Sequence, residues 1–150
     1  MTKPSLEILI GDDLLADPII SGSVKRCLEP LKERITFYTV ALTYASMPRE
    51  VINESQKDIY DVIVTDLDYG TTGKIGTEGF DILEYLSKMN LTKKPLVILC
   101  TSQVNQELEI RKRLDERKMH AIIGPDSNNK FSALKEYLIK TYSEKQVMRI

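Results

Sequence analysis

Two aspartates stand directly after an apolar run in the stretch 60–73, YDVIVTDLDYGTTG. The run from Val62 to Val64 is typical of a parallel strand that is buried on both faces. Ionised carboxylates are costly in such surroundings unless a cation, hydrogen bonds or water meet them. The carboxyl edge of a parallel sheet offers all three, and ligands bind there in open α/β folds. Asp66 and Asp68 therefore indicate a site at the end of this strand.

Other polar residues follow other apolar runs in the same way. Asp12 and Asp13 come after the apolar stretch 6–10, and Thr101 comes after the stretch 95–100. If the strands are neighbours, three or four carboxylates and a hydroxyl converge, and like charges then raise one another's pKa values. A hard divalent cation such as Mg²⁺ resolves this conflict. The alternative is that Asp12 and Asp66 simply cap the helices that follow, but the repeated use of one edge favours the site.

Five apolar stretches alternate with helical patterns along the chain and must position these residues. Strands are expected at 6–10, 35–42, 61–65, 95–100 and 119–123, and helices at 18–32, 46–56, 80–89, 104–114 and 129–144. Such alternation predicts an α/β fold, doubly wound, with a five-stranded parallel sheet and helices on both faces. Right-handed crossovers leave few topologies open to it.

Length and composition exclude several classes of protein. With 150 residues, 42% hydrophobic and 29% charged, the chain has the composition of one soluble globular domain. A net charge of −1 gives no general reason to expect nucleic acid or a membrane surface as partner. No apolar run is long enough to span a membrane, and the first residues lack a signal-peptide core, so we expect a cytoplasmic protein. Cys27 and Cys100 have no metal-ligand spacing, and the single histidine, His120, makes a histidine-based triad improbable.

Four segments resemble, in chain order, those of response-regulator receiver domains. They are ILIGDD at 8–13, DVIVTD at 61–66, EGFDILEYL at 78–86 and LVILCTS at 96–102. The resemblance covers nearly the whole chain, and it implies a flavodoxin-like receiver fold with the strand order 2-1-3-4-5. The expected organisation is a single receiver-like domain over residues 1–150 with no output domain.

The resemblance also implies a role for each residue of the acidic edge. Asp66 has the position of the phosphoacceptor, and Asp12 and Asp13 that of the acidic pair that binds Mg²⁺ together with Asp66 and the backbone carbonyl of Asp68. Thr101 has the position of the hydroxyl that hydrogen-bonds the phosphoryl group. A carboxylate can attack phosphorus in line to form an acyl phosphate. The partners implied are a histidine kinase or phosphotransfer protein and a downstream protein, with a homodimer as a further arrangement.

Three features depart from the receiver pattern. Gly124 and Pro125 stand where the family has Lys-Pro, so the cation that would face Asp66 is missing from its usual place. Lys74 and Lys130 lie nearby in sequence, but both are expected to be solvated loop lysines, and a Gly124→Lys substitution is expected to speed phosphorylation.

The second and third departures concern a loop and a switch residue. The loop from Asp66 to Gly79 is longer than the usual connection of the family and rich in Gly and Thr, and its role as lid, partner loop or insertion stays open. Ala121 stands where the family has its aromatic switch, with His120 beside it facing the other side of the strand. These features predict an atypical stand-alone receiver.

Two other functions remain alternatives. TDLDYGTTG and IGDDLLADP resemble the DxDGT and GDxxxD motifs of haloacid dehalogenase-type phosphatases. That interpretation makes Asp68 the general acid and Asp17 a carboxylate near the metal, but it requires a circular permutation, whereas the receiver order requires none. The other alternative is a receiver-like scaffold that binds a partner without phosphoryl chemistry. An enzyme with turnover is therefore the less favoured class.

Overall fold

Five parallel strands form one sheet in the computed structural model, which describes residues 3–67, 78–102, 107–117, 119–124 and 126–148. The strand order is β2-β1-β3-β4-β5, and every neighbouring pair is parallel. This arrangement confirms the predicted doubly wound α/β fold. The strands are β1 (Ser5–Gly11), β2 (Thr39–Ala45), β3 (Val62–Thr65), β4 (Leu96–Thr101) and β5 (His120–Ile123).

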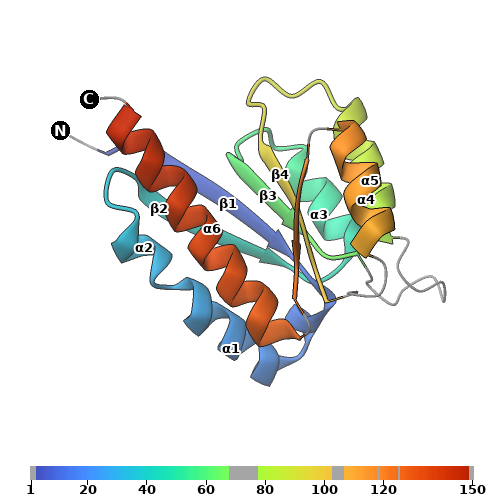
Figure 1. Cartoon of the computed structure of the whole chain (residues 1–150), viewed down its shortest axis with the longest axis horizontal. Coiled ribbons are helices and arrows are strands. Elements are labelled where there is room, and N and C mark those ends of the chain that lie inside the picture. Colours follow the sequence, from blue (N-terminus) through green and yellow to red (C-terminus); the bar gives the residue numbers. More distant parts are fainter. Residues whose placement is uncertain (1–2, 68–77, 103–106, 118, 125, 149–150) are drawn as a thin grey trace.

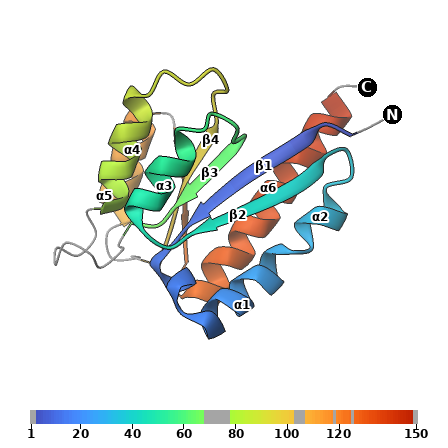
Figure 2. The ribbon, with the colours of Figure 1, turned by 180° about the vertical axis from the view of Figure 1, so that it is seen from behind.

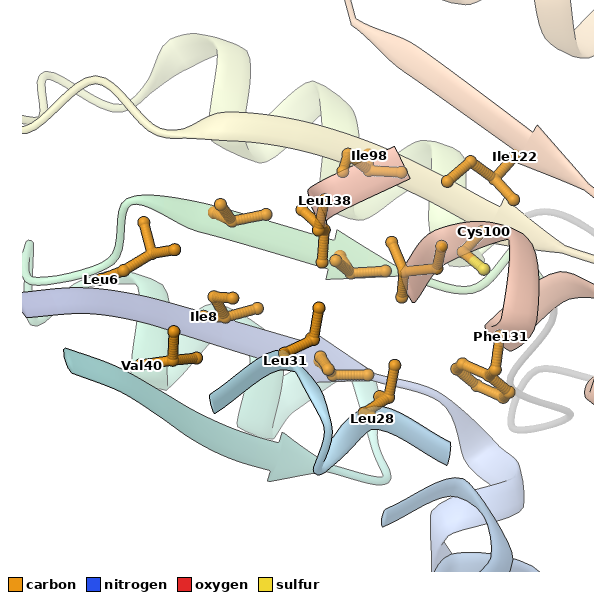
Figure 3. Packing of buried hydrophobic residues seen from close by; sticks show 14 of the residues in the cluster. Leu6, Ile8, Leu28, Leu31, Val40, Ile98, Cys100, Ile122, Phe131 and Leu138 are labelled. Carbon is orange, nitrogen blue, oxygen red and sulfur yellow. The ribbon is translucent and has the colours of Figure 1, made fainter. Parts of the chain in front are cut away.

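Helices cover both faces of the sheet (Figures 1 and 2). One face carries α1 (Pro18–Leu28), α2 (Leu31–Arg34) and α6 (Ser127–Met148), and the other carries α3 (Pro48–Ser55), α4 (Glu78–Lys88) and α5 (Glu107–Arg117). The core accordingly divides into two apolar clusters, one on each side of the sheet. In the first, Leu28 and Leu31 of the helices face Ile8 and Val40 of the strands (Figure 3). No helix in the described ranges is long and apolar enough to cross a membrane.

The first helical region differs from the sequence prediction. One helix was expected over 18–32, but α1 ends at Leu28 and the separate turn α2 begins at Leu31. Pro30 lies between them, and because proline has no backbone N–H it interrupts the ladder of a continuing helix. The start of α1 was predicted correctly, with Pro18 in its first turn and the Asp17 carboxylate accepting hydrogen bonds from two backbone N–H groups.

The second strand also lies later than predicted. The expected strand was 35–42, whereas β2 is Thr39–Ala45. Ile35 is instead the buried C-cap residue that follows α2, and Phe37 is half exposed. The strand begins where it can pair with β1, with Thr39 opposite Ser5. The residue types of 35–38 do not show where this pairing begins, so the predicted start of the strand was wrong by four residues.

The register brings the carboxyl ends of the strands together at one edge. Gly11, at the end of β1, is opposite Ala45 of β2 on one side and Thr65 of β3 on the other. The residues that immediately follow β1 and β3 therefore come out of the sheet side by side. These residues are Asp12 and Asp66.

Candidate functional site

Three carboxylates meet at this edge. Each of Asp12, Asp13 and Asp66 offers one oxygen, and these oxygens all lie within 4.8 Å of one another. Asp12 and Asp66 are buried and Asp13 is half-buried. The convergence follows from the parallel pairing of β1 and β3, as the sequence predicted.

Asp12 is held in place by its backbone and by one of its two carboxylate oxygens. Its N–H donates to the carbonyl of Ala45 at 3.0 Å, which continues the pairing of β1 with β2. Its Oδ1 accepts a hydrogen bond from the N–H of Leu14 at 3.0 Å and caps the 3-10 helix η1 (Asp13–Ala16). Asp12 therefore caps a turn, as the capping alternative predicted, while its Oδ2 accepts a hydrogen bond from Nζ of Lys130 at 2.6 Å.

Asp66 is fixed at the end of β3 in a similar way. Its N–H donates to the carbonyl of Gly11 at 3.0 Å, and its Oδ1 accepts a hydrogen bond from the N–H of Leu67 at 2.7 Å. The hydroxyl of Thr65 donates to the backbone carbonyl of Asp66 at 3.1 Å. The carboxylate therefore has a defined orientation beside Asp12.

Gly79 allows α4 to begin directly against the end of β3. Its N–H donates to the carbonyl of Leu67 at 2.8 Å. A Cβ atom at this position would overlap with the carbonyl oxygen of Asp66 and would lie 2.5 Å from the Cα of Leu67. Glycine is the residue type that permits so close an approach between backbones. Sequence reasoning gave Gly79 no part in the site, although it lies within EGF at the predicted helix start.

Burial and crowding raise the pKa values of two of the carboxyl groups. The pKa of Asp66 is raised to about 7 by burial, then by the charge of Asp12, against the opposing effects of Lys130 and the Leu67 N–H. The pKa of Asp13 is raised to about 6 by burial and then by Asp12. The cluster thus resists full ionisation, which is the situation that a bound cation relieves.

Among the described residues, a fourth charged group at this edge is Lys130, in the first turn of α6. Its side chain is 1% exposed, and its Nζ lies 2.6 Å from Oδ2 of Asp12 and 3.6 Å from Oδ1 of Asp66. Burial lowers the pKa of this ammonium group, but the charges of Asp66 and Asp12 more than offset that effect, so the pKa is raised. The prediction that Lys130 is a solvated loop lysine was wrong.

Two features of the backbone bring Lys130 to the site. Asp126 caps the start of α6 through the N–H of Asn129 at 2.9 Å, and its carbonyl accepts the N–H of Lys130 at 3.1 Å. Gly124, which follows β5, is packed against this turn, and a Cβ there would lie 2.7 Å from the backbone nitrogen of Lys130. The signal in the sequence was therefore a glycine in place of the expected lysine, followed by a capped helix with a lysine in its first turn.

The donor set fits a divalent cation. Three carboxylates and one ammonium group carry a net charge of −2 when all are ionised, and oxygen ligands are those that Mg²⁺ prefers. Asp12, Asp13 and Asp66 are the residues that would hold the ion. The carbonyl of Asp68, the loop lysine Lys74 and the rest of the stretch 68–77 lie outside the described residues.

The remaining predicted residues lie at the adjacent strands. Thr101 is buried at the end of β4, and its carbonyl accepts the N–H of Gly124 at 3.1 Å. Ala121 belongs to the apolar cluster on the α5 side of the sheet. His120 instead stacks on Tyr137 of α6, with the ring centroids 4.1 Å apart. The prediction that His120 and Ala121 face opposite sides of β5 is confirmed.

Comparisons with known proteins identify the fold. No protein-family model and no curated protein sequence matches the chain. The signal receiver domain of an HD domain-containing protein from Pseudomonas fluorescens Pf-5 is similar over 97% of this chain and 96% of its own, with a TM-score of 0.60 and 18% identity. The Francisella response regulator 1452 receiver domain is similar over 91% of this chain and 98% of its own, with a TM-score of 0.60 and 21% identity.

A response regulator receiver domain protein from Clostridium thermocellum is similar over 97% of this chain and 99% of its own, again with a TM-score of 0.60, at 20% identity. The sheet of this chain has the strand order β2-β1-β3-β4-β5, which the resemblance to receiver domains predicted. This chain therefore has the fold of response-regulator receiver domains.

Proposed function

We propose that this chain is an atypical receiver of phosphorelay signalling, in which Asp66 accepts a phosphoryl group with the help of Mg²⁺. The observation that carries the proposal is the meeting of Asp12, Asp13 and Asp66 within 4.8 Å at the carboxyl edge of a sheet with receiver topology. Asp66 is the favoured nucleophile because it follows the central strand β3. Asp12 and Asp13 are the favoured metal ligands beside it.

The transfer step is a displacement at phosphorus. An ionised oxygen of Asp66 attacks the phosphorus of the donor, a new O–P bond forms, and the bond between phosphorus and the leaving group breaks. The leaving group, acetate from acetyl phosphate or an imidazole nitrogen from a phosphohistidine, keeps the electron pair of that bond. Mg²⁺, when bound, neutralises charge on the transferring oxygens. Thr101 donates a hydrogen bond to a phosphoryl oxygen in this proposal, since it ends the neighbouring strand β4.

Mg²⁺-dependent labelling with acetyl phosphate, followed by intact mass, tests the proposal. Wild-type protein should gain the mass of one phosphoryl group with Mg²⁺ and none with EDTA, and hydroxylamine should remove it because an acyl phosphate is labile to this nucleophile. Asp66→Asn should not be labelled. Asp81→Asn, which changes an exposed aspartate of α4, is the matched control and should be labelled like wild type.

The signalling role would be carried out through protein contacts. A histidine kinase or phosphotransfer protein is the proposed donor, and a downstream protein or a second copy of the chain is the proposed recipient of the signal. Steady release of phosphate from small phosphoesters would instead favour the permuted phosphatase, with Asp68 and Asp17 in its chemistry. An unlabelled wild type that still binds a partner would favour the scaffold.

A further inference from the structure

We propose that Lys130, on α6, supplies the cation that contacts the phosphoryl group on Asp66, and that it competes with Mg²⁺ for Asp12 when that group is absent. The inference rests on the proposed function. The residue at the end of β5 is Gly124, which cannot supply a cation, and the inference assigns that role to a residue of α6. Three observations carry it.

The first observation is that the charged side chain of Lys130 is buried beside the site carboxylates. Lysine is among the residues that are almost never fully buried unless they are paired, and Lys130 is 1% exposed. Its partners are both site carboxylates, Asp12 at 2.6 Å and Asp66 at 3.6 Å. An ammonium group 3.6 Å from the proposed nucleophile can reach an oxygen of a phosphoryl group attached to it.

The second observation is that the backbone is shaped to bring this lysine in. Gly124 has no Cβ, and the main chain of Lys130 occupies the space that a Cβ would need. The thiol of Cys100, in β4, lies 3.7 Å from the carbonyl of Lys130, so the first turn of α6 also contacts the neighbouring strand. Phe131, the next residue, is buried in the apolar cluster near Cys100 and Leu28 (Figure 3). The contacts with Gly124 and Cys100, and the burial of the adjacent Phe131, therefore hold the backbone of Lys130 in place.

The third observation is the order of the two contacts. The ammonium lies nearer to Asp12 than to Asp66, and Asp12 is also one of the carboxylates that would hold Mg²⁺. A second cation at Asp12 is repelled by the ammonium. A phosphoryl group on Asp66 adds negative charge close to Lys130 and draws the ammonium toward it, which frees Asp12 for the metal. Lys130 therefore opposes Mg²⁺ binding and favours phosphorylation.

These opposite effects separate the proposal from a purely structural role. In Lys130→Met, labelling at saturating Mg²⁺ should slow roughly tenfold to a hundredfold, the range expected for a lost hydrogen bond to a charged group. Mg²⁺ should meanwhile bind more tightly than in wild type when titrated by calorimetry. Lys140→Met, which removes an exposed lysine of the same helix, is the control and should change neither quantity.

The outcomes are distinct. Slower labelling together with tighter Mg²⁺ binding supports the proposal. Labelling at the wild-type rate overturns it, and so does slower labelling together with weaker Mg²⁺ binding. If wild type itself is not labelled, the proposed function fails and this inference fails with it.

A double-mutant cycle covers the case in which Lys130→Met leaves Asp12 unpaired and does not fold. Asp12→Asn removes the carboxylate that lies nearer to Lys130, so of the two carboxylates that contact Lys130 the double variant keeps only Asp66. If Lys130 acts on the phosphoryl group, this double variant should be labelled more slowly than Asp12→Asn alone. Equal labelling of the two would mean that Lys130 only pairs with Asp12, and it would overturn the proposal.

Discussion

The backbone nitrogen of Lys130 occupies space beside Gly124 that a side chain at position 124 would need, since a Cβ there would lie 2.7 Å away. The two residues are therefore coupled: glycine at the end of β5 lets α6 begin close to the sheet, and the close approach puts the lysine among the carboxylates. A lysine at position 124 and the present position of Lys130 exclude each other sterically.

The first prediction follows from this coupling. Gly124→Ala and Gly124→Lys should each lower the stability, by about 1 to 3 kcal/mol as for other overpacked sites, when measured by urea unfolding. Gly22→Ala is the matched control, because a Cβ at Gly22 would meet only the flexible end of Arg26 at 3.4 Å. It should stabilise α1 by roughly 0.5 to 1 kcal/mol.

The same contact reverses an expectation from the sequence. Gly124→Lys was expected to speed labelling of Asp66, but in this structure it should displace the first turn of α6 and slow labelling. Faster labelling in Gly124→Lys, with unchanged stability, would contradict the coupling of the two positions.

The second prediction concerns Gly79. Gly79→Ala should push α4 away from the end of β3, because its Cβ would overlap with the carbonyl of Asp66. We expect a loss of about 1 to 3 kcal/mol in stability and, in addition, a weaker response of the melting temperature to Mg²⁺. A variant as stable as wild type would show that the end of β3 does not need this close approach.

The third prediction is that Mg²⁺ stabilises the folded protein. At a concentration a hundredfold above its Kd the ion should add about 2.7 kcal/mol, which is on the order of 5 to 10 °C in melting temperature for a chain of this size. The double variant Asp13→Ala, Asp66→Asn should lose this rise, while Asp81→Asn should keep it. An equal rise in the double variant would place the ion elsewhere.

The fourth prediction uses the single histidine. Burial, and then the charge of Arg111, lower the pKa of His120 below its ordinary value of 6.5. In the NMR titration of its ring signals, which are unambiguous in a chain with one histidine, the midpoint should lie below pH 6.5. A midpoint at or above that value would mean that the stack on Tyr137 does not bury the ring in solution.

The same shift predicts the sign of a pH effect on stability. Because the folded state binds the proton of His120 less tightly than the unfolded state, the contribution of this residue is fully present above pH 6.5. It is lost as the pH falls from there toward the pKa of the folded state. His120→Phe keeps the ring stack and removes the charge, so the difference in unfolding free energy between wild type and this variant should change in favour of the variant on acidification.

The sequence by itself determined the sheet and the acidic edge. Apolar runs alternating with helical patterns require a parallel sheet, and parallel strands end at a common edge, so Asp12 and Asp66 could be expected to meet. The beginning of β2 could not be located in the same way. The residues 35–38 have the types of a strand, but a strand also needs a partner, and β1 pairs only from Thr39 onward.

The position of Lys130 was decided by the tertiary structure alone. It is 118 residues from Asp12, and lysine in the first turn of a helix is ordinarily solvated. Its burial depends on where α6 begins and on the absence of a Cβ at Gly124. It also depends on the carboxylates of Asp12 and Asp66, which follow the strands β1 and β3. The two carboxylates are far from Lys130 in the sequence, so the residues around Lys130 do not by themselves predict its burial. The local sequence therefore predicted the aspartates of the site. The packing of α6 against the end of the sheet decided that Lys130 is the cation beside them.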